Sequence, residues 1–236
     1  MKFPHNVQQV VVLFCAIVVG GCAFLGVGHQ ETSLSDTGFP RSVETSIEQV
    51  VLVRPVLAHP TRAEVTLWQK RHGAWQAMDS PIKAVIGRNG LAPLNEKQEG
   101  DGRTPSGIFR LERAFGYPVK VRTKLVYAPV DEDDFWVDDP AAATYNRWVK
   151  GLPKAGSFER LRREDFLYRY AIVVEYNTNP IVAGKGSAIF VHVWRTPESS
   201  TAGCVAMSAG NVRRLLRWLD PEQNPVIILG DQEGAT

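Results

Sequence analysis

The chain alternates short apolar runs with polar breaks, and this pattern predicts a protein built mostly from β-strands. Apolar or alternating runs lie at residues 49–56, 82–86, 119–126, 167–176, 188–194 and 225–229. Runs of this length with period-two alternation are typical of strands. Two further runs, at residues 64–68 and 74–76, are separated by His72 and Gly73 and predict a hairpin.

One amphipathic helix is expected near the C-terminus. Val212, Leu215, Leu216 and Leu219 are spaced i, i+3, i+4, i+7, and Ser208 stands at the N-cap position. A shorter second helix is expected over residues 158–163. Many strands with few helices favour a β-sandwich or a barrel-like body with one clear helix packed on it.

The N-terminal segment has the pattern of an export signal. Lys2 and His5 precede an apolar stretch at residues 10–19, which is too short to span a bilayer and ends in Gly20-Gly21-Cys22. Small residues before a cysteine suit the peptidase that processes lipoproteins. We therefore predict a lipoprotein signal peptide over residues 1–21 and lipidation of Cys22. An ordinary secretory signal and a short uncleaved anchor are the alternatives.

The predicted signal sets the rest of the domain organisation. Residues 22–46 are rich in Gly, Ser and Thr and predict a flexible, lipidated tether. Residues 47–230 then form the folded domain. Because Ala23 carries no acidic group that would suggest retention in an inner membrane, a periplasmic lipoprotein anchored in an outer membrane is expected. The membrane would be contacted through the N-terminal lipid.

Composition excludes some partners and cofactors. The 27 Lys and Arg residues nearly balance the 25 Asp and Glu residues, so no nucleic-acid partner is expected. The five histidines show no metal-ligand spacing, and we expect neither a metal nor a cofactor. An acidic run at residues 131–139 surrounds Trp136. It predicts either a solvated loop or a cleft wall that favours a cationic amine.

The chemistry is concentrated at one cysteine. Cys15 lies in the predicted signal and Cys22 at its cleavage site, so Cys204 is left as an unpaired thiol in an oxidising compartment. His192 lies in the 188–194 strand, on the face shared by Phe190 and Trp194. A packed histidine and a buried, inert cysteine would also explain this spacing. A thiol, an imidazole and a bare glycine backbone together favour acyl transfer.

Several motifs, taken in order, resemble one known family. They are Gly87-Arg88-Asn89-Gly90, Glu99-Gly100-Asp101-Gly102-Arg103-Thr104-Pro105-Ser106-Gly107, Phe115-Gly116-Tyr117, Trp136-Val137-Asp138-Asp139-Pro140, Tyr145-Asn146, His192 and Thr201-Ala202-Gly203-Cys204. The set is similar to the L,D-transpeptidase (YkuD-like) catalytic domain, in a branch with Thr-Ala-Gly-Cys at the active site. The resemblance covers about residues 50–230.

The resemblance implies a mostly β catalytic fold that acts on peptidoglycan stem peptides. By position, Cys204 becomes the nucleophile and His192 its general base and acid. The backbone amides of Gly203 and Cys204 become the oxyanion donors. We expect the substrate to be bound by residues around this pair and by the acidic segment, namely Trp194, Arg195, Thr201 and Trp136.

Two positions depart from the commoner family motif. Ala202 replaces a second histidine before the glycine, and Ala206 replaces an arginine two residues after the cysteine. Arg195 would be the substitute for the missing cation. The leading interpretation is a cysteine acyltransferase that works through a thioester. A carboxypeptidase or endopeptidase with water as acceptor is one alternative, and a non-catalytic cell-wall-binding lipoprotein is another.

Overall fold

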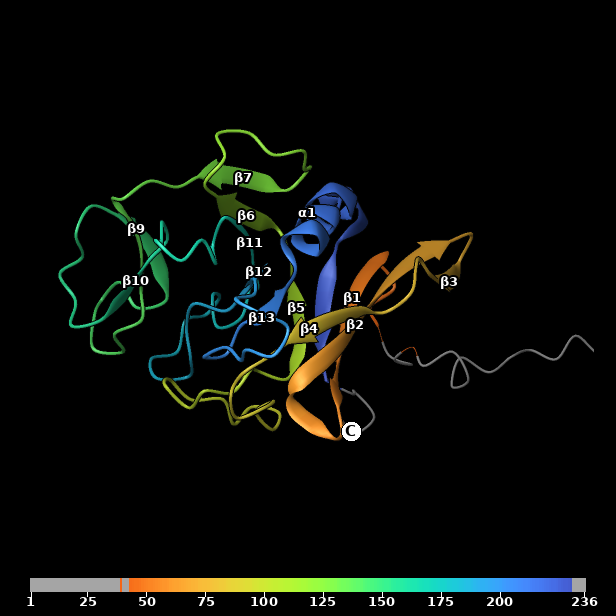
Figure 1. Cartoon of the computed structure of the whole chain (residues 1–236), viewed down its shortest axis with the longest axis horizontal. Coiled ribbons are helices and arrows are strands. Elements are labelled where there is room, and N and C mark those ends of the chain that lie inside the picture. Colours follow the sequence, from red (N-terminus) through yellow and green to blue (C-terminus); the bar gives the residue numbers. More distant parts are fainter. Residues whose placement is uncertain (1–38, 40–42, 231–236) are drawn as a thin grey trace, which may run out of the picture. The chain divides into compact units, whose positions relative to one another are not determined.

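The computed structural model describes residue 39 and residues 43–230. Within these residues, eleven strands form one sheet in the order β5-β14-β1-β2-β4-β13-β12-β11-β6-β7, with β3 paired to β2 (Figure 1). This is the main sheet. Its strands are β1 (Gln49–Val56), β2 (His59–Arg71), β3 (Ala74–Ala77), β4 (Ile82–Val85), β5 (Gly107–Arg110), β6 (Arg113–Gly116), β7 (Val126–Pro129), β11 (Tyr170–Val173), β12 (Phe190–Val193), β13 (Val205–Met207) and β14 (Val226–Leu229).

The predicted hairpin is confirmed by the pairing of β2 with β3. His72 and Gly73 have φ values of 51° and 81°, which suit a tight turn with both central residues in the left-handed region. The other early runs also form strands, because β1 pairs antiparallel with β2 and β4 pairs with β2 on its other side. The predicted closing strand is confirmed as β14, which pairs in parallel with β1.

The predicted C-terminal helix is confirmed as α1 (Ala209–Trp218), the α-helix of the described part of the chain. The Ser208 side chain accepts a hydrogen bond from the Asn211 N–H, as an N-cap should. The apolar face of α1 is buried, and the helix contacts β11 and β12. A 3-10 helix, η2 (Pro221–Gln223), follows it. The mostly β fold class with one helix near the C-terminus is confirmed.

A small sheet stands apart from the main sheet. It consists of β8 (Asp134–Val137), β9 (Arg147–Lys150) and β10 (Phe158–Arg160), in the order β10-β8-β9. The helix expected over residues 158–163 is wrong, because residues 158–160 extend and pair antiparallel with β8, Phe158 opposite Val137. A partner strand distant in sequence decides this conformation, and its pairing leaves no local signal.

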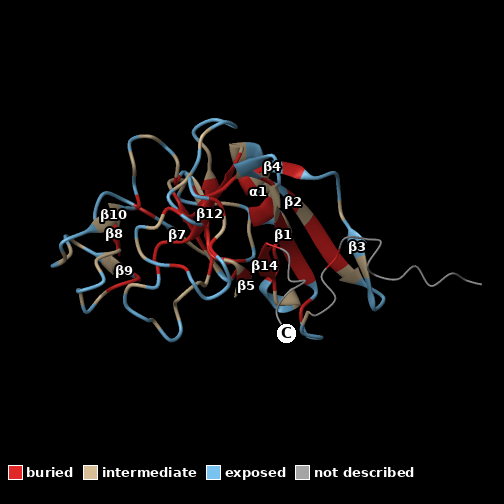
Figure 2. Cartoon of the chain, turned by 90° about the horizontal axis from the view of Figure 1, so that it is seen from below, coloured by how far each residue is buried: buried red, intermediate tan, exposed pale blue. Residues whose placement is uncertain are grey.

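The strand expected over residues 119–126 is also wrong, because β7 begins only at Val126. Val119 is 78 % exposed and Val126 is 70 % exposed. The alternation of apolar and polar residues in this segment therefore does not indicate a buried face of a sheet. Figure 2 shows that burial is concentrated in the main sheet, above all in β1 and β2, whereas the loops around β9 and β10 are largely exposed.

The predicted tether does not reach to residue 46. Phe39 is buried, and its ring stacks on Trp75 and tilts against Trp68, with centroid distances of 4.5 Å and 5.1 Å. Val43 packs against the same apolar cluster. Phe39 and Val43 therefore pack on the core, whereas Glu44, Thr45 and Ser46 are exposed. Cys22 and the predicted signal lie outside the described residues. No helix among those described is long and apolar enough to cross a membrane.

Candidate active site

Two adjacent parallel strands bring the candidate nucleophile and base together. Cys204 immediately precedes β13, which pairs in parallel with β12, and His192 lies opposite Ala206 in this register. Both side chains are almost fully buried, Cys204 at 6 % exposure and His192 at 5 %. They line one cavity of about 190 Å³, here named the His192 cavity, with Trp194, Arg195, Thr201, Ala202 and Ala206.

The thiol of Cys204 is held by backbone groups. Its Sγ accepts from the Phe190 N–H at 3.4 Å and lies 3.3 Å from the Ala188 carbonyl oxygen, to which the S–H donates. Burial raises the pKa of Cys204 to about 12, and the negative charge of Glu159 acts in the same direction. The resting sulfur is therefore a neutral thiol at physiological pH.

The imidazole of His192 is oriented by the backbone. Its Nδ1 lies 2.9 Å from the carbonyl oxygen of Val193. Because a carbonyl can only accept, Nδ1 carries the proton and Nε2 keeps the lone pair of a base. Burial lowers the pKa of His192 to about 4. A neutral base thus stands in the same cavity as a neutral thiol, and the proton must move during the reaction itself.

The turn before Cys204 is built by two threonines. Thr201 Oγ1 accepts from the Gly203 N–H at 3.1 Å and donates to the Cys204 carbonyl oxygen at 2.7 Å. Thr104 Oγ1 donates to the same oxygen at 3.3 Å and accepts from the Gly87 N–H at 2.9 Å. The sequence motifs around Gly87 and Thr104 therefore support the turn that carries the thiol. The Gly203 N–H, expected as an oxyanion donor, is engaged by Thr201 here.

Gly203 is required by this turn for steric reasons. Its φ is +155°, at the limit of what L side chains adopt, and a Cβ there would lie 3.0 Å from the Arg103 carbonyl oxygen. The backbone beside the sulfur can therefore approach the 103–104 turn only without a side chain.

The four residues expected to bind substrate fall in two places. Trp194, Arg195 and Thr201 line the His192 cavity. Trp136 does not, because it is 2 % exposed and its ring packs edge-on against Phe190 at 5.0 Å. Its Nε1–H donates to Asn146 Oδ1 at 2.9 Å. Trp136 is thus a core residue behind the site.

Arg195 contributes a cation at the cavity rim. Its Nη2 donates to Asp165 at 3.2 Å, and Asp165 also accepts a two-pronged contact from Arg163, at 2.9 Å and 2.7 Å. Arg163 lines the same cavity. The two guanidinium groups of Arg163 and Arg195 therefore line this cavity together with the carboxylate of Glu159, while Asp165 pairs with both arginines. The role of Arg195 as a substitute cation stays a prediction.

Sequence reasoning missed three residues next to the pair. The Tyr168 ring packs edge-on against His192 with centroids 5.2 Å apart, and its hydroxyl donates to Glu159. Asn146 Oδ1 accepts from the Ala188 N–H at 3.1 Å, beside the carbonyl that holds the thiol. Asn146 was visible only as part of the family pattern. Glu159 and Tyr168 had no local signal.

A second cavity of about 200 Å³ lies on the other side of the thiol. It is named the Lys97 cavity and is lined by Arg88, Lys97, Glu99, Gly100, Asp138, Glu159, Ser187, Ala188, Ile189, Ala202, Gly203 and Cys204. Glu99 accepts from the hydroxyls of Tyr145 and Ser187, each at 2.6 Å, which fixes its carboxylate on the cavity wall.

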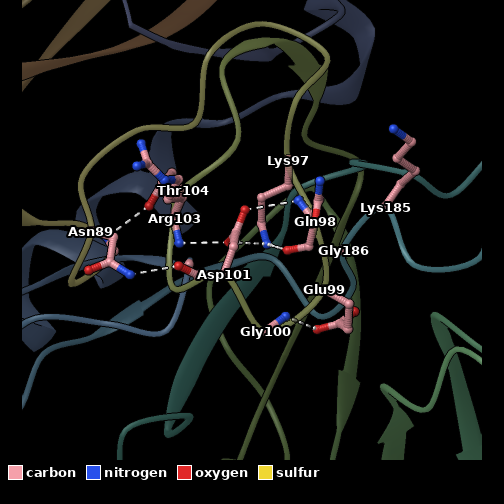
Figure 3. A network of polar contacts seen from close by, with 12 residues as sticks. Asn89, Lys97, Gln98, Glu99, Gly100, Asp101, Arg103, Thr104, Lys185 and Gly186 are labelled. Carbon is pink, nitrogen blue, oxygen red and sulfur yellow. Dashed lines mark hydrogen bonds and ion pairs between the residues drawn. The ribbon is translucent and has the colours of Figure 1, made fainter.

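The loop that carries Glu99 is held by an ion pair (Figure 3). Lys97 is 4 % exposed, and its Nζ donates to Asp101 Oδ1 at 2.7 Å. Asp101 also accepts from the backbone N–H groups of Gln98 and Arg103, at 2.9 Å and 2.8 Å. No group of three or more His, Cys, Asp or Glu side chains among the described residues is arranged to hold a metal ion.

The comparisons identify the family. A family model for the L,D-transpeptidase catalytic domain, YkuD, matches residues 56–228. The chain belongs to this family. The match includes both Cys204 and His192, and it confirms the resemblance seen in the motifs. The Thr-Ala-Gly-Cys branch remains a prediction.

The solved structures that resemble this chain are distant in sequence. Bd1075 of Bdellovibrio bacteriovorus is 15 % identical with a TM-score of 0.42, covering 78 % of this chain and 48 % of that one. The helical cell shape determining protein Pgp2 of Campylobacter jejuni is 17 % identical with a TM-score of 0.39, covering 79 % and 48 %. The chain spans about half the length of these proteins. No curated protein sequence matches it.

The two departures from the commoner L,D-transpeptidase motif occupy different environments. Ala206 is 1 % exposed and lies beside His192 across the strand pair. Ala202 is exposed and lines both the His192 cavity and the Lys97 cavity. Ala202 therefore leaves open space between the two cavities, where the commoner motif has an imidazole.

Proposed function

We propose that the protein is a cysteine acyltransferase that acts on peptidoglycan stem peptides through a thioester. The observation that carries the proposal is that His192 in β12 and Cys204, just before the neighbouring parallel strand β13, line one cavity. Family membership supports the substrate class, since L,D-transpeptidases act on stem peptides. The open cavities on both sides of the thiol support the entry of an acyl donor and a second substrate.

The proposed first step transfers one proton and breaks one amide bond. The sulfur of Cys204 attacks the carbonyl carbon of the third stem residue while His192 Nε2 takes the thiol proton. The C–N bond to the terminal D-amino acid then breaks, and the leaving nitrogen takes the proton from His192. The Cys204 N–H, and the Gly203 N–H when Thr201 releases it, are the proposed donors to the oxyanion.

The second step distinguishes an acyltransferase from a hydrolase. An amine that attacks the thioester gives a cross-link or an attached protein, and water gives a carboxypeptidase or endopeptidase. We propose transfer to an amine as the main activity. The carboxylates of Glu99, Asp138 and Glu159 on the Lys97 cavity support this choice, since they favour a cationic amine over neutral water.

We further propose that the body is displayed in the periplasm as a lipoprotein acylated at Cys22 and held in an outer membrane. The motif Gly20-Gly21-Cys22 after a short apolar stretch supports this. Labelling cells with a tagged fatty acid should mark the wild type and leave the Cys22→Ala variant unlabelled. A labelled variant would exclude this anchor.

Purified muropeptides with a tetrapeptide stem test the activity. Mass spectrometry should detect release of the terminal D-amino acid and a product that joins two stems. A shortened stem without joined product would establish the hydrolase instead. Release by a Cys204→Ala variant would refute the thiol mechanism.

A carbapenem separates an enzyme from a binding protein. The lactam carbonyl must pass through a tetrahedral anion, so adduct formation needs working oxyanion donors as well as a sulfur. We expect the lactam to add to Cys204 in the intact protein. If iodoacetamide adds there and the lactam does not, the chain is a cell-wall-binding protein with an inactive site.

A further inference from the structure

Glu159 stands where three cavities meet. It lines the His192 cavity, the Lys97 cavity and a groove of about 1010 Å³, here named the outer groove. Tyr117, Phe158, Arg162 and Phe166 are among the residues of the outer groove. Among the described residues, Glu159 is the one that lines all three. A ligand that extends from the outer groove to the thiol therefore passes its carboxylate.

The position of this carboxylate is fixed from two sides. In β10, Glu159 pairs with Trp136 of β8, which is buried in the core. The Tyr168 hydroxyl donates to its Oε2, and the Tyr168 ring rests on His192. The carboxylate is thus tied to the same aromatic residue that positions the base. It cannot swing away without breaking a buried contact.

The carboxylate lacks a cation of its own. Arg163 is the nearby guanidinium, and its ion pair is with Asp165. No Lys or Arg of the described residues forms an ion pair with Glu159. Burial raises the pKa of the Glu159 carboxyl most, the positive charge of Arg163 lowers it, and the negative charges of Asp138 and Glu99 raise it. Because Arg163 is already paired with Asp165, a bound ammonium group would stabilise this buried carboxylate further.

We propose that Glu159 binds the ammonium group of the acyl acceptor and takes one of its protons, so that an amine rather than water resolves the thioester. The inference rests on the proposed function and adds to it the residue that selects the second substrate. The acceptor class is a primary amine carried on a peptide. Burial raises the pKa of the Glu159 carboxyl, which makes it a better proton acceptor than an exposed glutamate.

The step balances in protons and bonds. The ammonium gives one proton to the Glu159 carboxylate and becomes a nucleophilic amine. Its nitrogen forms the C–N bond to the acyl carbon, and a second proton passes to His192 Nε2. The C–S bond then breaks, and Cys204 takes that proton from His192. Glu159 returns its own proton to solvent before the next cycle.

The same residue links acceptor binding to the thiol. The negative charge of Glu159 raises the pKa of Cys204, so neutralising Glu159 should ease thiolate formation. Several charged and titratable groups line the two cavities around the sulfur: Glu159, Lys97, Arg163, Tyr168, His192, Arg195, Arg88, Glu99 and Asp138. Alkylation of Cys204 in Glu159→Gln should therefore begin at lower pH than in the wild type. A purely structural role for Glu159 would not move this profile.

Product ratios from a tetrapeptide muropeptide test the proposal. The ratio of joined product to shortened stem should fall by about 10²-fold in Glu159→Gln, the lower end of what a lost general base costs. Glu159→Asp keeps the charge and should retain part of the ratio. Glu222→Gln removes an exposed carboxylate that lines none of the three cavities and should keep the wild-type ratio.

The outcomes separate this inference from the proposed function. A wild-type ratio in Glu159→Gln, or a wild type that yields only shortened stem, would overturn the role of Glu159 while the thiol chemistry stands. No release of the D-amino acid by the wild type would overturn the proposed function itself. If thermal unfolding shows that the Glu159→Gln protein does not fold, Tyr168→Phe is the second variant to measure. It keeps the aromatic ring against His192 but removes the hydroxyl that donates to Glu159. Because this hydroxyl positions the Glu159 carboxylate, an unchanged product ratio in Tyr168→Phe would also refute the proposal.

Discussion

The main sheet and the small sheet are held together by different interactions. In the main sheet, the strands that carry the site are buried by apolar contacts, and Val191, Val205 and Met207 have no exposed surface. In the small sheet, polar side chains connect the strands in addition to the buried rings of Phe135 and Trp136. The Trp148 Nε1–H donates to Asp134 at 2.9 Å, and Lys150 lies 3.1 Å from the same carboxylate.

Because the two sheets are stabilised differently, we expect them to have different roles in the function of the protein. The strands that carry Cys204 and His192 are held mainly by apolar packing, which depends less on charge than the contacts of the small sheet do. The small sheet presents charge, because β10 supplies Glu159 and Arg160, and Arg162 and Arg163 follow directly after it. The chemistry should therefore depend on the main sheet, and the choice of substrate on the small sheet.

The largest expected effect is a loss of turnover from a change at Cys204 that leaves the packing of the main sheet intact. Cys204→Ser should abolish turnover, because a buried hydroxyl next to a neutral imidazole is a much weaker nucleophile than the thiol. The Phe190 N–H and the Ala188 carbonyl can still bond to serine, so the free energy of unfolding should change by no more than about 1 kcal/mol. Muropeptide turnover and thermal unfolding measure the two effects. Residual turnover would mean that the nucleophile lies elsewhere.

A smaller effect on rate is expected from the base. His192→Ala should slow formation of the acyl-enzyme by about 10²- to 10⁴-fold, the usual contribution of a general base. Single-turnover measurement of D-amino acid release reports this rate. His59→Ala removes an exposed imidazole at the start of β2, outside this cavity, and is the matched control. An unchanged rate in His192→Ala would make His192 a packed strand residue.

The buried histidine also predicts a pH dependence of stability. Its pKa is about 4 in the folded protein and about 6.5 when unfolded, so between these values only the unfolded chain binds the proton. Stability should therefore be full above pH 6.5 and fall as the pH drops towards 4, by an amount on the order of 3 kcal/mol. Denaturant unfolding of wild type and His192→Gln measures it. If the free energy of unfolding of the two proteins changed in parallel between pH 6.5 and 4, the imidazole of His192 would not be buried in its neutral form.

The smallest expected effect concerns the link between the two sheets. Asn146 follows β8 and accepts from the Ala188 N–H just before β12, and it also donates to the carbonyls of Tyr176 and Asn177. Asn146→Ala leaves these groups unpaired and should cost about 2 kcal/mol of unfolding free energy. Activity should fall too, because Ala188 holds the thiol.

An exposed asparagine provides the control for this link. Asn89 donates one hydrogen bond to the Asp101 carbonyl on an exposed loop, so Asn89→Ala should change stability by about 0.5 kcal/mol or less. Equal losses in the two variants would show that the contact between the sheets is unimportant. Urea unfolding resolves a difference of this size.

The regular part of the main sheet could be predicted because its signals are local. The β1 and β14 runs are continuous and apolar, and α1 has both a 3.6-residue period and a capping serine. The 119–126 run failed because alternation alone does not show whether a partner strand covers it. The 158–160 strand failed because its partner, β8, lies more than 20 residues earlier in the sequence.

In the candidate site too, some residues could be predicted from the sequence and others could not. Cys204 and His192 are recognisable by residue type, since an unpaired thiol and a strand histidine are unusual in this setting. The positions of Tyr168 and Glu159 depend on how β10 and β11 approach the site from opposite sides, and the residue types alone do not reveal it. Trp136 was expected on the cleft wall, yet its indole serves the core, because its N–H finds a buried partner in Asn146.

The contact of Phe39 with Trp75 and Trp68 ties residue 39 to the β2–β3 hairpin. In Figure 1 this hairpin lies on the opposite side of the main sheet from the small sheet, which carries Glu159. A pulling force applied to the chain at Phe39 would therefore load these ring contacts before it reached the strand that carries Glu159.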